Sequence, residues 1–204
     1  MNVYIISWFD NRLSRVHSFK NLIHYYLKLD YKIVILWMNN EKYKISHPNI
    51  NYINSEVINA SVARNKLLKL FYNSDQNEAI FSDDDVQILT YDLLQESFND
   101  NEIITFISHI KRKPKTFKYP LFSSTLFKIK KSKTKVFFDE KLQANQDLDF
   151  GYNCFFNKLK IKEVYTQKLY NNKENSVMFL DEEDRKKKKK ETFNLINKKY
   201  GITL

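Results

Sequence analysis

The chain has 204 residues, 43% of them hydrophobic and 15% aromatic, which predicts one globular domain and excludes a disordered chain. Only 2 glycines and 3 prolines occur, which argues against a glycine-rich phosphate loop, a collagen-like repeat or a flexible linker. The formal net charge of +10 favours anionic partners such as nucleic acid, an anionic membrane face or phosphorylated ligands, and a lysine-rich solvated surface explains it equally well.

The first 85 residues alternate between predicted strands and predicted helices. Short apolar runs predict strands at residues 3–7, 31–38, 51–54 and 78–82. Apolar residues recur at helical spacing over residues 14–29 and 61–72. This alternation predicts an α/β fold with a mostly parallel central sheet flanked by helices. In such sheets, ligands bind beyond the carboxyl ends of the strands.

The second half of the chain is less regular. We expect strands at residues 103–107, 124–129 and 161–170, and an extended or turn segment at 136–142. Helices are expected at residues 147–158 and 181–200, the second of which is highly charged and is followed by Gly201 as a C-cap.

Three consecutive carboxylates, Asp83, Asp84 and Asp85, follow the strand at residues 78–82. They repel one another, and a divalent cation with hard oxygen ligands, Mg²⁺ or Mn²⁺, relieves that repulsion. In an extended segment Asp83 and Asp85 point the same way and Asp84 points opposite, which predicts Asp83 and Asp85 as the metal ligands. The alternative is a solvated acidic turn in which an aspartate caps the next helix.

At these residues the sequence resembles GT-A-fold glycosyltransferases, particularly family-2-like enzymes, whose relatives include phage and viral enzymes that modify DNA. Four motifs stand in the order of that family: residues 59–65 (NASVARN), 81–85 (FSDDD), 137–140 (FFDE) and 146–150 (QDLDF). The resemblance covers roughly residues 1 to 180.

The resemblance implies a single-domain GT-A fold, with residues 1–85 as the nucleotide-binding half, 86–180 as the acceptor half and 181–204 as a basic C-terminal helix. It implies transfer of a sugar from a nucleotide-diphosphate sugar, favoured as a UDP-sugar, to an acceptor hydroxyl. The expected stereochemistry is inverting and the expected cofactor is Mn²⁺ or Mg²⁺. The acceptor would be a glycan, a lipid-linked sugar or a hydroxymethylated base in DNA.

The resemblance also implies site residues. The donor would be contacted by Ser7, Asp10, Arg64, Asp83 and Asp84, and the metal would be bound by Asp83 and Asp85. An arginine fork such as that of Arg64 suits a pyrophosphate, although a surface helix position explains it as well. Asp147 matches the general base of inverting enzymes, and Asp149 is the alternative base. Asp147 could equally cap the helix that it begins.

Two departures from the family pattern concern the active site. Gln146 stands where the family usually has glutamate. The late histidine that ligates the metal in many relatives is missing, since all four histidines (His17, His24, His47 and His109) precede residue 110. Asn171 or Asn172 could take its place with weaker oxygen coordination.

The single cysteine, Cys154, excludes an internal disulfide and a cysteine-based metal site. No run approaches about 18 consecutive apolar residues, so we expect no membrane-spanning helix. The first apolar run has no basic region before it, which indicates a strand and not a signal peptide. These features predict a cytoplasmic protein, in the host cytoplasm if the chain is viral.

Two other functions remain open from the sequence: a nucleic-acid-binding module without catalysis, and a metal-dependent nucleotidyltransferase. Basic residues cluster in three places, at residues 111–113, 128–135 and 186–190. If the acceptor is DNA, the first two clusters should lie beside the donor crevice. The third is interpreted as a solvated helix surface, because five consecutive lysines define no single helix face.

Overall fold

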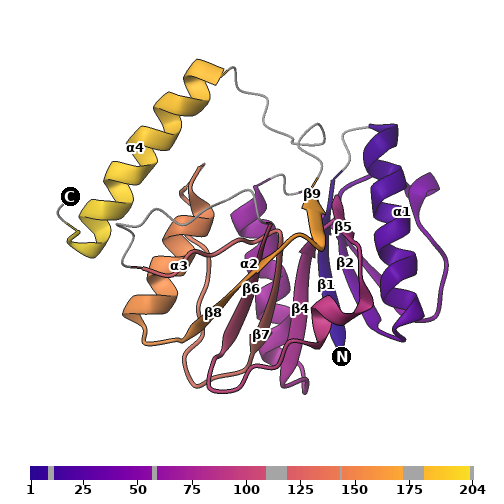
Figure 1. Ribbon diagram of the computed structural model, residues 1–204. Helices are drawn as coiled ribbons and strands as arrows, with labels where there is room; N and C mark the ends of the chain where they lie inside the picture. The colour runs from indigo at the N-terminus through magenta and orange to yellow at the C-terminus, as the bar shows by residue number, and fades with distance from the viewer. Residues whose placement is uncertain (9–11, 57–58, 109–118, 143, 172–181, 203–204) are drawn as a thin grey trace.

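The computed structural model describes residues 1–8, 12–56, 59–108, 119–142, 144–171 and 182–202 (Figure 1). A seven-stranded sheet forms its centre, in the order β3-β2-β1-β4-β7-β6-β8. The strands are β1 (Asn2–Ser7), β2 (Lys32–Trp37), β3 (Ile50–Asn54), β4 (Glu78–Asp83), β6 (Ile103–Ser108), β7 (Leu126–Lys130) and β8 (Ile161–Thr166). All neighbours run parallel except β7, which is antiparallel to both β4 and β6. The predicted α/β fold with a mostly parallel sheet is confirmed.

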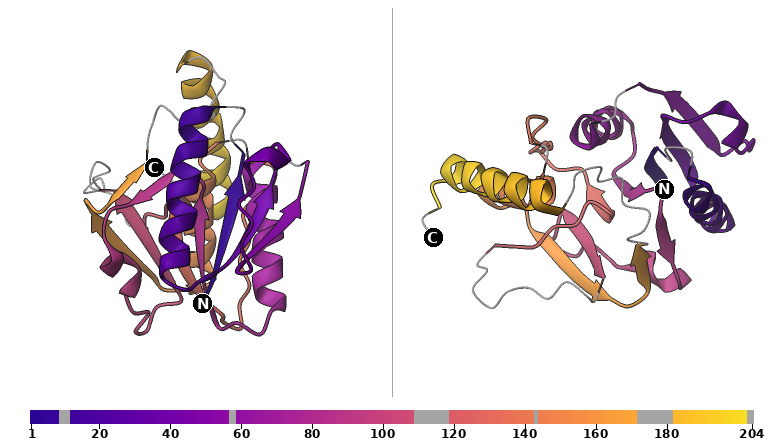
Figure 2. Two further views of the ribbon diagram at one scale, coloured as in Figure 1. Left: turned by 90° about the vertical axis from the view of Figure 1, so that its right-hand side faces the viewer. Right: turned by 90° about the horizontal axis from the view of Figure 1, so that it is seen from above.

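Helices cover both faces of this sheet (Figure 2). They are α1 (Leu13–Lys28), α2 (Ala60–Asn73), α3 (Gln146–Phe156) and α4 (Glu182–Tyr200). Alternation along β1 explains the two layers, because Val3 and Ile5 pack with α1 whereas Tyr4 packs with α2 and α3. Buried on both faces, β1 is therefore a nearly continuous apolar run.

An aromatic row crosses the middle of the sheet on the side of α2. Tyr4, Phe81 and Phe127 are register partners on β1, β4 and β7. Their rings are stacked with centroids 5.0 Å apart in each pair. Cross-strand aromatic pairs of this kind stabilise a sheet beyond the area they bury. The row fixes β7 against β4 immediately below the end of β4 that carries the aspartates.

One predicted element differs in the structure. Residues 161–170 were expected to form one strand, but they form β8 and the separate β9 (Leu169–Asn171). The chain bends between them, where the Thr166 hydroxyl accepts a hydrogen bond from the Lys168 backbone N–H at 3.0 Å. β9 pairs instead with β5 (Val86–Ile88), a three-residue strand too short to show a period in the sequence.

The other predicted strands and helices are confirmed, with ends that agree to within two residues. Two short 3₁₀ helices, Glu41–Tyr43 and Tyr91–Gln95, were not predicted. Residues 136–142, expected to be extended or turn, contain no regular element where they are described. None of the helices in the described ranges is long and apolar enough to cross a membrane.

Candidate functional site

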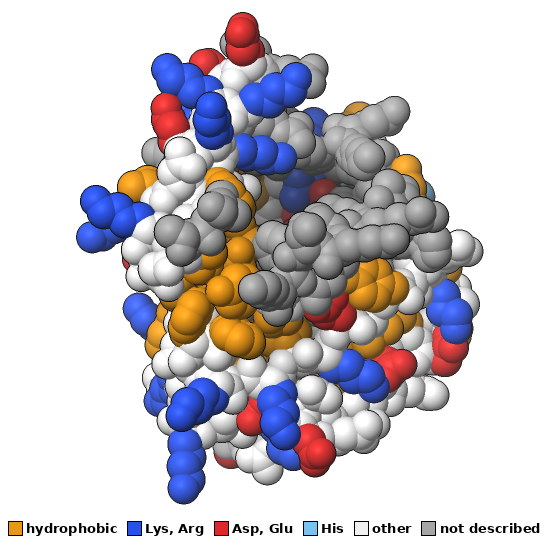
Figure 3. Space-filling view, turned by 60° about the vertical axis from the view of Figure 1, so that its left-hand side comes forward, with side chains coloured by type: hydrophobic (Ala, Val, Ile, Leu, Met, Phe, Trp, Pro, Cys, Tyr) orange, Lys and Arg blue, Asp and Glu red, His pale blue; other side chains and the backbone are white. Residues whose placement is uncertain are grey.

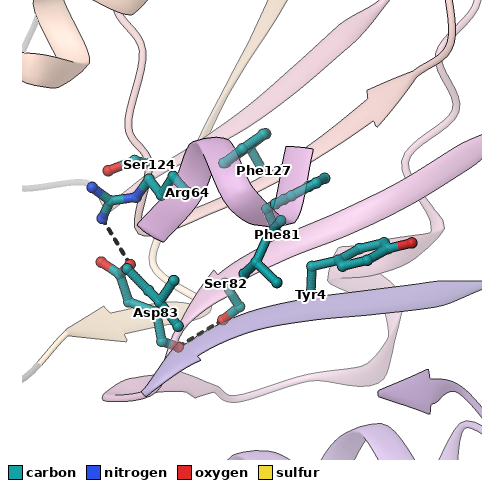
Figure 4. Close-up of a pocket in the computed structure, with 9 residues that line it drawn as sticks. Tyr4, Arg64, Phe81, Ser82, Asp83, Ser124 and Phe127 are labelled. Carbon is teal, nitrogen blue, oxygen red and sulfur yellow. Dashed lines mark hydrogen bonds and ion pairs between the residues drawn. The ribbon is translucent and has the colours of Figure 1, made fainter. Parts of the chain in front are cut away.

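The carboxyl ends of β1, β2 and β4 meet at one edge of the sheet. Ser7 is the register partner of Trp37, and Ile6 that of Asp83. A small pocket opens there between β1, β4, β7 and α2, and Figure 4 shows Arg64 reaching over it toward Asp83. Because parallel strands bring their carboxyl ends together, residues far apart in sequence converge at this edge.

Arg64 binds Asp83 across this pocket. Arg64 lies in the second turn of α2, a helix capped by the Asn59 side chain, which accepts the N–H groups of Ser61 and Val62. A terminal nitrogen of Arg64 lies 2.8 Å from Oδ1 of Asp83. Burial lowers the pKa of Arg64, but the carboxylates of Asp83 and Asp147 raise it by more, so that the net shift is upward.

Asp84 is fully buried and is held from two directions. Nε and a terminal nitrogen of Arg15, in the first turn of α1, lie 2.8 and 2.7 Å from its Oδ1. The backbone N–H of Trp8, which follows β1, donates to Oδ2 at 2.9 Å. Asp84 thereby connects the end of β4 to the segment between β1 and α1.

Asp85 is 5% exposed and is incompletely paired. Its Oδ2 lies 3.8 Å from Arg15, and its buried Oδ1 has no hydrogen-bond partner within the described residues. Burial, together with the charges of Asp83 and Asp84, raises the pKa of Asp85 to about 7, against the lowering effect of Arg15. A carboxylate oxygen left without a donor among further carboxylates is a donor set that suits a divalent cation, so the residues present fit Mg²⁺ or Mn²⁺.

The expected alternation of the three aspartates stops at Asp83. Asp83 is the last residue of β4, and Asp84 and Asp85 form the turn into β5. The side chains therefore divide differently from an extended segment, with Asp83 on Arg64 and the other two on Arg15.

No three His, Cys, Asp or Glu side chains gather as a metal cluster in the described part of the chain. Of the asparagines considered as a further ligand, Asn171 ends β9 and Asn172 lies outside the described residues.

The predicted base contacts lie at the end of β1. Ser7 is fully buried, and its carbonyl oxygen and Oγ accept hydrogen bonds from Nδ2 of Asn39 at 2.8 and 3.0 Å. Asn39 follows β2, so that this contact closes the sheet edge between β1 and β2. Asp10, the other residue predicted here, lies outside the described residues.

Asp147 and Asp149 occupy different environments on the first turn of α3. Asp147 is half-buried, and its charge influences both Arg64 and Asp83, which places it beside the pocket. Asp149 is fully buried, and its Oδ1 accepts a hydrogen bond from Lys199 of α4 at 2.8 Å. Residue 145 precedes the helix with no side-chain cap, so the predicted capping alternative for Asp147 does not describe this helix start.

The basic clusters lie differently from the DNA-acceptor expectation. Lys128 is 4% exposed and donates to the carbonyl oxygens of Leu94 and Glu96, and burial lowers its pKa. Because β7 is antiparallel to β4, Lys130 pairs with Glu78, at the sheet edge opposite Asp83. The expectation that residues 128–135 border the donor crevice is therefore wrong. Residues 111–113 lie outside the described residues.

The third basic cluster lies on α4. Figure 3 shows lysine and arginine side chains gathered over this helix, next to a hydrophobic surface. Nδ2 of Asn145 donates to the carbonyl oxygen of Lys189 at 2.7 Å, so the lysine run passes the start of α3.

Four residues of this region were not singled out from the sequence: Arg15, Asn39, Asn65 and Lys199. Each acts through a partner distant in the chain, as with Arg15 and Asp84, which are 69 residues apart. Only Asn65 carried a signal, because it ends the NASVARN motif directly after Arg64.

Comparisons with known proteins give structural matches alone. No protein-family model and no curated protein matches the chain. A putative nucleotide-diphospho-sugar transferase from Desulfovibrio desulfuricans superposes with a TM-score of 0.56 at 10% identity, over 98% of this chain and 97% of that one. The chain has the GT-A fold.

Two further structures support this fold. HddC from Yersinia pseudotuberculosis, complexed with GMP-PN, has a TM-score of 0.51 at 11% identity, over 85% of this chain and 95% of that chain. Drosophila β1,4-galactosyltransferase 7, as a D211N mutant with manganese, UDP-Gal and xylobiose, has a TM-score of 0.50 at 11% identity, over 92% and 79%. The chain spans 57% of the length of the galactosyltransferase LgtC. The structural neighbours thus include glycosyltransferases, and nucleotidyltransferases are also among them.

Proposed function

We propose that this protein is a glycosyltransferase that moves a sugar from a nucleotide-diphosphate sugar to an acceptor hydroxyl. One observation carries the proposal: the Arg64 guanidinium lies in the field of both Asp83 and Asp147 at the carboxyl edge of the sheet. A cation for the donor diphosphate and a carboxylate for the acceptor thus adjoin one pocket. The proposal assigns residues 1–85 to donor binding and 86–180 to acceptor binding within one domain.

The donor would lie along the ends of β1 and β4. Arg64 would exchange part of its contact with Asp83 for the diphosphate, whose geometry suits a guanidinium. Asp83 and Asp85 would hold Mn²⁺ or Mg²⁺, and such an ion would offset negative charge on the leaving nucleoside diphosphate. Asp84 would act through position, since its oxygens are occupied by Arg15 and Trp8.

The transfer itself needs one base. The acceptor hydroxyl oxygen forms a bond to the anomeric carbon as the bond from that carbon to the diphosphate oxygen breaks. Asp147 takes the proton of the hydroxyl, and the electron pair of the broken bond leaves with the nucleoside diphosphate. Attack from the face opposite the leaving group inverts the anomeric centre. Asp147 suits this role because it is half-buried at the pocket, while Asp149 is enclosed and paired with Lys199.

Glycan acceptors fit the described surface better than DNA does, because Lys128 and Lys130 do not border the pocket. Hydroxymethylated DNA remains the second acceptor to be assayed. A UDP-sugar is the favoured donor, and a cytoplasmic location follows from the sequence expectations.

A screen of nucleotide-sugars with millimolar Mn²⁺ tests the proposal. A donor present at about 100 times its dissociation constant should stabilise the fold by roughly 2.7 kcal/mol, visible as a raised melting temperature. The Asp85→Ala variant should lose that response. If no nucleotide-sugar raises the melting temperature or is hydrolysed, the proposed activity is wrong.

A metal-dependent nucleotidyltransferase is the second candidate, favoured by the similarity in fold to HddC. The two activities leave different products. Glycosyl transfer releases a nucleoside diphosphate, whereas nucleotidyl transfer from a nucleoside triphosphate releases pyrophosphate. Incubation with a sugar phosphate and each nucleoside triphosphate, followed by pyrophosphate detection, separates them.

A further inference from the structure

A segment without regular structure, Phe138 to Glu140, connects the donor helix α2 to the acceptor helix α3. Asn65 of α2 holds it by three hydrogen bonds. Its Oδ1 accepts the backbone N–H of Phe138 at 2.8 Å, and its Nδ2 donates to the Phe138 carbonyl oxygen and to Oε1 of Glu140, both at 2.9 Å. Nδ2 of Asn59 adds a contact to the Glu140 carbonyl oxygen at 3.3 Å. The start of α2 therefore fixes this segment at two points.

The ring of Phe138 lies between the two sides of the candidate site. The Arg64 guanidinium carbon is 5.5 Å from the centroid of this ring. Phe150 of α3 stacks on the ring, with centroids 4.2 Å apart and planes 20° apart. Phe150 is fully buried and lies three residues after Asp147. A rigid contact chain thus runs from Arg64 through Phe138 and Phe150 to the turn of α3 that carries Asp147.

We propose that Asn65 is a positioning residue that sets the separation between Arg64 on the donor side and Asp147 on the acceptor side. The inference rests on the proposed glycosyl transfer. Asn65 touches neither reacting group; it fixes the backbone of Phe138, whose ring contacts Arg64 on one side and Phe150 on the other.

The chemistry of the amide explains why asparagine stands here. Asn65 is 3% exposed, and it must both accept and donate within one planar group to match the backbone N–H and C=O of Phe138. Aspartate at this position keeps the acceptor, loses the donor and faces the carboxylate of Glu140. Alanine leaves two buried backbone groups without partners.

Transfer is more sensitive than donor binding to this separation. A displacement of about 1 Å between reacting groups can lower a rate by roughly 10²-fold. The donor contacts of Arg64 and Asp83 arise from α2 and β4 alone, so they survive a shift of α3. Loss of the Asn65 contacts should therefore lower kcat for transfer and leave nucleotide binding nearly unchanged.

The experiment compares Asn65→Ala and Asn65→Asp with Asn101→Ala. Asn101 is a matched control, because its Nδ2 also donates to a backbone carbonyl, that of Phe98 at 3.1 Å, but far from α2. Three quantities are measured for each: the dissociation constant of the nucleoside diphosphate, kcat and KM for transfer, and backbone hydrogen exchange. We expect Asn65→Ala to lower kcat about 10- to 100-fold with a dissociation constant within about 2-fold of wild type.

Hydrogen exchange supplies a readout that does not depend on the activity. In Asn65→Ala, faster exchange should be confined to Phe138–Glu140 and the first turns of α3, with β1 and β2 unchanged. Equal losses in nucleotide binding and kcat, or exchange that rises across the whole sheet as a general loss of stability, overturns the positioning role. If the wild type binds no nucleotide-sugar, the proposed function fails, and localised or unlocalised exchange still decides whether Asn65 positions α3.

Discussion

Arg15 places two guanidinium nitrogens on a single oxygen of Asp84, at 2.8 and 2.7 Å, where the Asp84 side chain is fully buried. The other oxygen of Asp84 accepts the Trp8 backbone N–H. This ion pair connects the first turn of α1 to the end of β4, and it also brings positive charge to Asp85. The arrangement of the three aspartates depends on it.

The first prediction concerns this pair. Arg15→Met should destabilise the protein by about 3–5 kcal/mol, because it leaves the buried Asp84 carboxylate without a counter-ion. Arg15→Lys should cost less, since it keeps the charge but loses the two-nitrogen contact. Urea unfolding measures both. A free energy of unfolding for Arg15→Met within about 1 kcal/mol of wild type would contradict a structural role for the pair.

The order of strands and helices could be predicted from the sequence because burial leaves a period. Val3 and Ile5 face one helix layer and Tyr4 faces the other, which yields a continuous apolar run. The partners of charged side chains leave no such period. Arg15 stands in an amphipathic helix pattern as one more polar residue, and nothing local indicates that it reaches Asp84.

The candidate site was predictable as far as the chain is extended. Strand periodicity placed Asp83 at the end of β4 correctly, and it failed from Asp84 onward because the chain turns into the three-residue β5. The lysines of β7 show the same limit. Their spacing could not reveal that β7 runs antiparallel to β4 and carries Lys130 away from the aspartates.

The second prediction is a pH dependence set by Asp85. Burial raises its pKa in the folded protein to about 7, above the ordinary value of roughly 3.9 in the unfolded chain. Between these values the folded state holds a proton that the unfolded state releases, so stability should fall as pH rises from about 4 to 7. Asp85→Asn should flatten this slope and be more stable than wild type at pH 8. Denaturation in metal-free buffer at several pH values is the measurement, and an unchanged slope would place the titration elsewhere.

The third prediction concerns Lys199, which joins α4 to the acceptor half. Its Nζ lies 2.9 Å from Oδ2 of Asp139 and 2.8 Å from Oδ1 of the buried Asp149. Lys199→Met should lower stability by about 1–3 kcal/mol, because Asp149 keeps its charge without a partner. Asp149→Asn in the same chain should recover part of the loss. A double-mutant cycle measures this coupling, and strict additivity of the two changes would show that the pair contributes nothing.

The last prediction separates the two carboxylates of α3. Asp147→Asn should lower transfer by roughly 10²-fold or more while the nucleoside diphosphate binds as in wild type, as expected for a lost general base. Its half-buried position and its influence on Arg64 and Asp83 place it at the pocket. Asp149→Asn should act chiefly on stability, because it weakens the contact to Lys199 and leaves the pocket side of α3 intact. Asp139→Asn is the matched control, since it removes the other carboxylate on Lys199. Transfer at saturating donor, corrected for the folded fraction of each variant, distinguishes the roles. A harmless Asp147→Asn beside a folded but inactive Asp149→Asn would move the base to Asp149.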